Sequence, residues 1–144
     1  MQRAIDEADI RRRMDKWAEA IRSTDLDGVA SHYASEIVSF DVGPPLRHPG
    51  AEAKKKNWAV LFSMFERPLG YEIRDLTIMV GDDVAFAYSL NRIKGTTKDG
   101  RSNDAWVRFT ACFRKFESNW LIVHDHVSVP VDPPSGKALM NLAP

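Results

Sequence analysis

The first part of the chain carries apolar residues at the spacing of amphipathic helices. From Asp6 to Arg22 they recur every three or four residues, which places them on one helical face. These residues are Ile10, Met14, Trp17 and Ile21. After a group of capping residues, the same spacing predicts a second, short helix from Leu26 to about Ala34. Two helices are therefore expected before any strand.

A third helix is predicted after Pro49-Gly50, again from the spacing of apolar side chains. Its apolar positions are Trp58, Leu61, Phe62 and Phe65. The lysine run 54–56 is expected on the side of this helix that faces water. Between the second and third helices, residues 37–40 form a short β-prone run. The run ends before Pro44-Pro45, where no backbone N–H can join a ladder.

Beyond Pro68 the pattern changes to alternation, which predicts four antiparallel strands between Tyr71 and Val129. A phase slip near Asp75 indicates a β-bulge where the sheet bends. On the next strand we expect one face to point inward: Val84, Phe86, Tyr88 and Leu90. On the last strand Asp125 shares its face only with apolar residues. A parity error of one residue would turn His126 inward instead.

The opposite face of the last two strands combines polar and apolar side chains. The polar ones are Arg108, Thr110, His124, His126 and Ser128, and the apolar ones are Trp106, Phe116, Trp120 and Ile122. This composition suits a protein interface, so a homodimer is expected. The His-x-His pair lacks a convincing third ligand, and no metal site is predicted.

This order of elements predicts an α+β protein: one domain over residues 1–144, with a curved antiparallel sheet packed against three N-terminal helices and an irregular tail at 130–144. Composition adds limits to this interpretation. Equal numbers of basic and acidic residues, 20 each, leave no basic field for nucleic acid or an anionic membrane. A single cysteine, Cys112, and the lack of any long apolar run favour a cytoplasmic location.

Well-known cofactor and hydrolase motifs do not occur in the sequence. It contains no Gly-rich phosphate cradle, no G-x-S-x-G elbow and no H-E-x-x-H helix. Cys112 lies in mid-strand between Ala111 and Phe113, where a thiol usually packs as a small hydrophobic group. No cofactor is therefore expected.

Two stretches carry a resemblance to a known family: YASEIVSFDVGPPLRHPG at 33–50 and WLIVHDHVSVP at 120–130. Both resemble the SnoaL-like branch of the superfamily that includes ketosteroid isomerase and nuclear transport factor 2. The second stretch is also similar to the association domain of calcium/calmodulin-dependent kinases. The resemblance implies the cystatin-like roll of that superfamily, in which the curved sheet is cone-shaped. It does not imply one function, because these relatives include isomerases, dehydratases, cyclases and non-catalytic dimerisation modules.

Asp41 is the best catalytic candidate under this resemblance. In ketosteroid isomerases the general base is an aspartate at the end of the first short strand, and Asp41 occupies the matching place. Apolar neighbours there would favour its neutral form and raise its pKa, which would make it a stronger base. The alternative is a turn-forming aspartate that accepts hydrogen bonds from nearby backbone amides.

The chain departs from the family pattern at the groups that stabilise the oxyanion. The positions of the two family tyrosines carry Trp17 and Trp58, and the position of the family acid carries Ala111, or Cys112 if the alignment is shifted by one. An indole donates one hydrogen bond but cannot shuttle a proton. Steroid isomerisation by the familiar mechanism is therefore not expected.

The expected site is an aromatic pocket around Asp41. Trp17 and Trp58 either pack as ordinary core or bind a planar or cyclic ligand, and four further aromatic residues would complete the wall: Phe62, Phe86, Tyr88 and Phe109. The expected partner is therefore a small apolar or cyclic ligand. The first hypothesis is a cofactor-free enzyme of small hydrophobic molecules, isomerase-like or dehydratase-like. In it Asp41 moves a proton and Asp125 or His126 stabilises or relays charge. The alternative is a non-catalytic ligand-binding or dimerisation domain.

Overall fold

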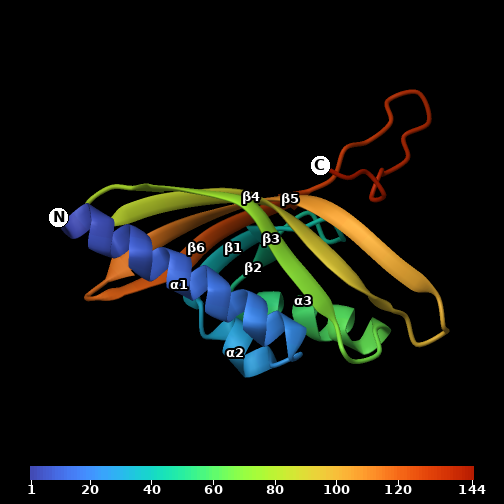
Figure 1. Cartoon of the computed structure of the whole chain (residues 1–144), viewed down its shortest axis with the longest axis horizontal. Helices are drawn as coiled ribbons and strands as arrows, with labels where there is room; N and C mark the ends of the chain where they lie inside the picture. Colours follow the sequence, from blue (N-terminus) through green and yellow to red (C-terminus); the bar gives the residue numbers. More distant parts are fainter.

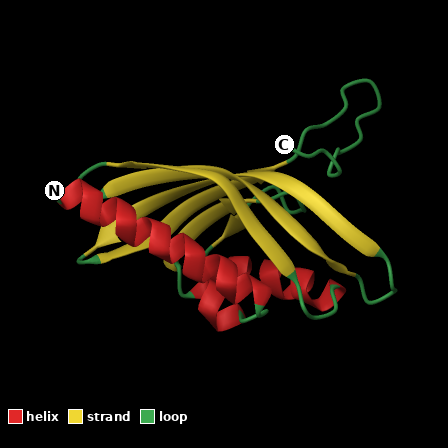
Figure 2. Ribbon diagram, viewed as in Figure 1, coloured by secondary structure: helices red, strands yellow, loops and turns green.

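The computed structural model describes residues 1–144 as three helices and one six-stranded sheet (Figure 1). The helices are α1 (Gln2–Arg22), α2 (Leu26–Ala30) and α3 (Ala51–Met64). The strands are β1 (Tyr33–Phe40), β2 (His48–Pro49), β3 (Gly70–Val80), β4 (Val84–Thr96), β5 (Ser102–Phe116) and β6 (Asn119–Ser128). Figure 2 shows the helices on one side of the curved sheet, as expected for the predicted α+β class.

The sheet is mixed, whereas the sequence predicted an antiparallel one. The strand order is β2-β1-β6-β5-β4-β3, and β3 to β6 form the predicted antiparallel meander. The difference is β1, which lies parallel to β6. The two strands are far apart in sequence, so no hairpin forces them to run in opposite directions. This pairing brings the end of β1, where Asp41 follows, beside the middle of β6.

Local boundaries follow the tertiary pairing more closely than the helical periodicity. The second helix ends at Ala30 instead of Ala34, because Tyr33 already pairs with Ile122 of β6. The predicted bulge in β3 is present. Asp75 has a φ of 57° and the register against β4 shifts between Arg74 and Thr77.

A second irregularity in β6 corrects the predicted faces of that strand. Cys112 pairs with His124 and Phe113 pairs with Ile122, so Val123 is an extra residue in the ladder. Trp120 and Ile122 therefore point into the core, each 1% exposed, and not toward an outer interface as expected from simple alternation. Beyond the bulge, Asp125 also points inward, as predicted.

The predicted inward face of β4 is wrong. Phe86 and Tyr88 are 44% and 50% exposed, and the inner face carries Ala85, Ala87, Ser89 and Asn91 instead. Alternation defines two faces but does not say which one is concave. The concave face offers less room for each side chain, and small residues fit there: Ala87 pairs with Ala111, and both are fully buried.

Candidate functional site

A buried lysine lies next to the candidate base. The sequence placed Lys54 on the wet side of α3 with its neighbours, but its side chain is buried, whereas Lys55 pairs with the exposed Asp27 at 2.6 Å. Lys54 shares the helical face of Trp58 and Leu61, four and seven residues later. That spacing could have placed Lys54 on the apolar face of α3, but three consecutive lysines suggested a face toward water.

Lys54 joins side chains from three elements into one charged cluster, which consists of Ser39, Asp41, Lys54 and Asp125. Its Nζ lies 2.9 Å from Asp41 Oδ2, 2.9 Å from Ser39 Oγ and 3.4 Å from Asp125 Oδ2. Ser39 donates a further hydrogen bond to Asp125. Burial alone would lower the pKa of Lys54, but the nearby Asp125 and Asp41 carboxylates outweigh burial and raise it. Lys54 is therefore a fixed cation.

Asp41 is held as an ionised carboxylate at the edge of this cluster. Its Oδ2 accepts from Lys54 and from Asn57 Nδ2 at 2.9 Å, and its Oδ1 accepts from the Val42 N–H at 2.8 Å. Burial raises the pKa of Asp41, but Lys54 and these hydrogen bonds lower it more, so the pKa lies below its ordinary value. The raised pKa expected from sequence is therefore wrong, because that expectation lacked the lysine.

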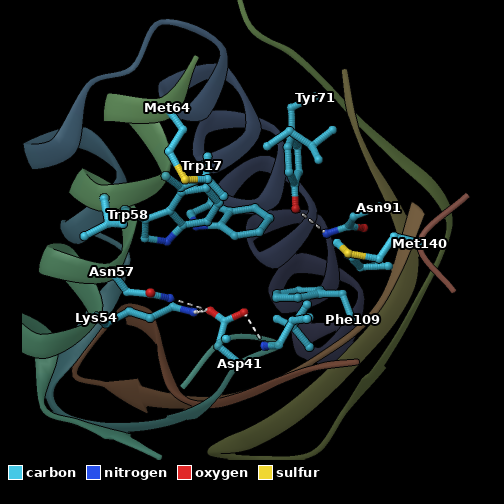
Figure 3. Close-up of a pocket in the computed structure, with 17 residues that line it drawn as sticks. Trp17, Asp41, Lys54, Asn57, Trp58, Met64, Tyr71, Asn91, Phe109 and Met140 are labelled. Atoms are coloured by element: carbon cyan, nitrogen blue, oxygen red, sulfur yellow. Dashed lines mark hydrogen bonds and ion pairs between the residues drawn. The ribbon is translucent and has the colours of Figure 1, made fainter. Parts of the chain in front are cut away.

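Asp41 also lines a mostly apolar pocket, which has a volume of about 310 Å³ (Figure 3). Its aromatic walls are Trp17, Trp58, Tyr71 and Phe109. Aliphatic and sulfur-containing side chains complete them: Val42, Val60, Leu61, Met64, Ile93, Val107, Val127 and Met140. The remaining polar lining groups are Lys54, Asn57 and Asn91. A charged acceptor thus faces a space that is otherwise mostly apolar.

The two tryptophans present ring surfaces to this pocket. Trp17 stacks on Phe109 with ring centroids 5.1 Å apart and meets Trp58 edge to face at 6.0 Å. Both indole N–H groups donate to the hydroxyl of Tyr33, at 3.1 and 2.7 Å. Since an indole has a single donor, neither tryptophan keeps a polar group for a ligand.

Hydrogen-bond donors lie across the pocket from Asp41 (Figure 3). Asn91 Nδ2 donates to Tyr71 Oη at 2.8 Å, and Ser89 Oγ donates to Asn91 Oδ1 at 2.6 Å. Burial raises the pKa of Tyr71, so it remains a neutral phenol. Because its oxygen accepts from Asn91, its own hydrogen can be donated to an acceptor in the pocket. Sequence reasoning missed Tyr71 and Asn91, which meet only through the register of β3 and β4.

The C-terminal tail contributes one pocket wall. The backbone N–H of Trp106 donates to the backbone carbonyl of Met140 at 3.3 Å, at a position of β5 that no longer pairs with β6. This contact places the Met140 side chain in the lining of the pocket (Figure 3). The sequence predicted a tail over the surface or along an edge, without this contribution.

The structure brings together only part of the predicted site. Asp41, Trp17, Trp58 and Phe109 line the pocket. Phe62 packs against Trp58, with ring centroids 5.5 Å apart, and does not line it. Phe86, Tyr88 and His126 lie on the outer face of the sheet, away from the pocket. Asp125 lies behind the pocket wall and reaches it only through Lys54.

No group of three or more histidine, cysteine or acidic side chains is arranged to hold a metal ion. In the His-x-His pair, His124 Nδ1 lies 2.6 Å from the backbone carbonyl of Val38, and His126 is exposed. None of the three helices combines the length and the apolar character needed to cross a membrane.

Comparison with known proteins identifies the family. The model of the SnoaL-like domain matches residues 10–132. An NTF2-like protein of unknown function from Pseudomonas putida KT2440 is 32% identical over 98% of both chains, with a TM-score of 0.89. The chain therefore belongs to the SnoaL-like family within the NTF2-like superfamily.

More distant structures share the fold. A ketosteroid isomerase-like protein from Erwinia carotovora atroseptica SCRI1043 is 21% identical over 84% of this chain and 93% of its own, with a TM-score of 0.72. A candidate scytalone dehydratase from Novosphingobium aromaticivorans DSM 12444 is 14% identical over 87% and 84%, with a TM-score of 0.78. A comparison with curated proteins gives no match.

Proposed function

We propose that this chain is a cofactor-free enzyme of small hydrophobic carbonyl compounds, isomerase-like or dehydratase-like, in which Asp41 transfers a proton. One observation carries the proposal: an ionised carboxylate faces an apolar pocket whose opposite wall offers neutral hydrogen-bond donors. The descriptions of the two distant structures, ketosteroid isomerase-like and scytalone dehydratase, suit the same class of reaction.

The residues divide the chemistry between the two walls. Asp41 Oδ1 carries one hydrogen bond, so a lone pair remains to accept a proton from the carbon beside a carbonyl. The electron pair of the broken C–H bond moves onto the carbonyl oxygen, which accepts from Tyr71. Isomerisation returns the proton from Asp41 to another carbon. In dehydration the carbonyl re-forms instead, a C=C bond forms as hydroxide leaves the next carbon, and the hydroxide takes the proton back from Asp41 to form water.

The lowered pKa of Asp41 limits its strength as a base but keeps it ionised across the neutral range. The pocket also limits the size of the substrate. Its volume of about 310 Å³ is close to the lower end of the range for small-molecule sites. This favours a compound of one or two rings over a larger one.

A ligand screen with cyclic ketones and enones tests the proposal. Binding is followed by quenching of tryptophan fluorescence, because Trp17 and Trp58 line the pocket, and by thermal shift. Wild type should bind and convert one of these compounds, and Asp41→Asn should bind it but lose turnover by roughly 10²–10⁴-fold. Equal turnover in both proteins would exclude Asp41 as the base.

The alternative is a non-catalytic ligand-binding or dimerisation domain. The outer face of the sheet favours the second of these, a dimerisation domain. Several large apolar side chains are at least 39% exposed there: Phe40, Met79, Val84, Phe86 and Tyr88. We propose a cytoplasmic homodimer through this face. Phe86→Glu should then convert the dimer to a monomer in analytical ultracentrifugation, whereas a monomeric wild type would contradict this interface.

A further inference from the structure

Asp125 carries a buried charge that the proposed reaction does not use directly. The residue is 0% exposed and does not line the pocket, so a ligand cannot touch it. Its Oδ1 accepts from Ser39, whereas its Oδ2 has no hydrogen-bond donor and lies 3.4 Å from Lys54 Nζ. A buried carboxylate oxygen without a donor is costly, and its position calls for an explanation.

The charges of the cluster do not balance. Asp41 and Asp125 contribute two carboxylates, and Lys54 is the one ammonium between them. Lys54 Nζ donates hydrogen bonds to Asp41 and Ser39, and it forms an ion pair without a hydrogen bond with Asp125. Lys54 is therefore the counter-ion of both carboxylates and not of Asp41 alone.

We propose that Asp125 is a positioning residue that shares the positive charge of Lys54 with Asp41. Because the charge is shared, Asp41 accepts a proton more readily than a carboxylate that is the sole partner of a lysine. Asp125 also repels a negative charge on Asp41 through the mostly apolar surroundings. Both effects favour the protonated form of Asp41, against the effect of Lys54. For catalysis, this inference rests on the proposed function.

The other titratable groups around the cluster do not have the same effect. His48 of β2 lowers the pKa of Asp41, and Tyr33 of β1 and Tyr71 of β3 are neutral phenols with raised pKa values. Burial, and to a lesser degree the charge of Asp125, raises the pKa of the Cys112 thiol on β5, which pairs with His124. Asp125 is thus the second carboxylate in direct contact with Lys54, and its charge is the one that opposes Lys54.

The test is a carbon-13 NMR titration of the Asp41 carboxyl in ligand-free protein, which requires no known substrate. Asp125→Asn should shift the titration midpoint of the Asp41 carboxyl to lower pH than in wild type, because Lys54 is then the counter-ion of Asp41 alone. Lys54→Met should shift it to higher pH, because burial and Asp125 are no longer opposed. Opposite shifts from two variants of one cluster would not arise from a merely structural role of Asp125.

Asp27→Asn is the matched control, since it removes a carboxylate from the neighbouring surface lysine, Lys55. It should leave the Asp41 titration unchanged. If Asp125→Asn does not fold, Asp125→Ser removes the same charge with a smaller side chain. An Asp41 midpoint that is unchanged or raised in the neutral Asp125 variant would overturn the proposal.

A kinetic arm separates this inference from the proposed function. With a converted ketone, Asp125→Asn should move the acid limb of kcat/KM to lower pH and reduce its plateau. If no compound is converted but the NMR shifts appear, the proposed function fails and the role of Asp125 in setting the proton affinity of Asp41 stands.

Discussion

Two buried aspartate–lysine clusters occupy different parts of this molecule. In the first, Asp6 of α1 accepts from Lys115 Nζ of β5 at 3.0 Å and from Trp120 Nε1 of β6 at 3.2 Å. In the second, Lys54 lies between Asp41 and Asp125. Both clusters contain nearly inaccessible carboxylates and a lysine, yet only the second opens on an apolar pocket.

The difference lies in charge balance and in access. The first cluster has one carboxylate for one ammonium, and its donors tie α1 to the sheet. The second has two carboxylates for one ammonium, and one of them faces space that a ligand can fill. Balanced, enclosed charges are typical of a structural tie, whereas an excess charge beside a pocket is typical of a functional site.

The largest expected effect is on stability, from removal of the cation in the second cluster. Lys54→Met leaves Asp41 and Asp125 buried without their counter-ion, and should lower the free energy of unfolding by about 3–5 kcal/mol. Urea denaturation at pH 7 measures this difference. Lys115→Met should cost less, because the Lys115 side chain is 22% exposed and that of Lys54 is 2% exposed.

Lys55→Met is the control for this prediction. It removes a lysine from the adjacent position of α3, where the partner Asp27 is exposed, and should change stability by less than about 1 kcal/mol. Equal losses in the Lys54 and Lys55 variants would contradict a special role for the buried cluster.

A pH titration of stability sharpens the comparison by separating His32 from both clusters. Burial, together with Arg13 and Lys16, lowers the pKa of His32 to about 4. The unfolded chain takes up this proton near pH 6.5, so stability is complete above that value and falls by about 3 kcal/mol as the pH drops to 4. Asp6 and Asp41, whose folded pKa values are lowered, lose their contribution only below about pH 3.9.

His32→Asn keeps an acceptor for Arg13 but cannot take up a proton. Chemical denaturation at a series of pH values should therefore give a much flatter profile between pH 6.5 and 4 in this variant than in wild type. A slope that persists unchanged would assign the acid loss to another group.

A smaller effect is expected from Tyr33, whose hydroxyl accepts from the indole N–H groups of Trp17 and Trp58 beside the second cluster. Tyr33→Phe removes the acceptor of both indole N–H groups, so two donors lose their partner and the free energy of unfolding should fall by about 2 kcal/mol. Thermal unfolding measures the loss, and a fluorescence shift reports the tryptophans. A variant as stable as wild type would show that the indoles find other acceptors.

Sequence reasoning predicted the parts of this fold that depend on local pattern. Helical spacing gave α1 and α3, alternation gave the meander of β3 to β6, and a visible phase slip gave the bulge near Asp75. The slip at Val123 could not be seen, because Leu121 and Val123 are as apolar as Trp120 and Ile122. The predicted faces of β4 were reversed for a similar reason: sheet curvature, and not hydrophobicity, decides that the small side chains lie on the concave face.

The candidate site was predicted less completely than the fold. Asp41, Trp17, Trp58 and Phe109 were identified from their local context and the family resemblance. Lys54 was missed because a lysine in a charged run normally faces water. Its burial depends on two carboxylates, on β6 and after β1, that meet only in the folded sheet. The donors Tyr71 and Asn91 likewise come together only through strand register.

The most direct test of the account is deuterium exchange at the carbon beside the carbonyl of small cyclic ketones in D₂O, followed by proton NMR. It detects proton transfer even where no product accumulates. We expect wild type to catalyse the exchange of at least one such ketone, Asp41→Asn to lose it, and Asp6→Asn to keep it despite lower stability. Exchange that persists in Asp41→Asn, or that is lost equally in a folded Asp6→Asn protein, would contradict the division of the two clusters into a functional and a structural one.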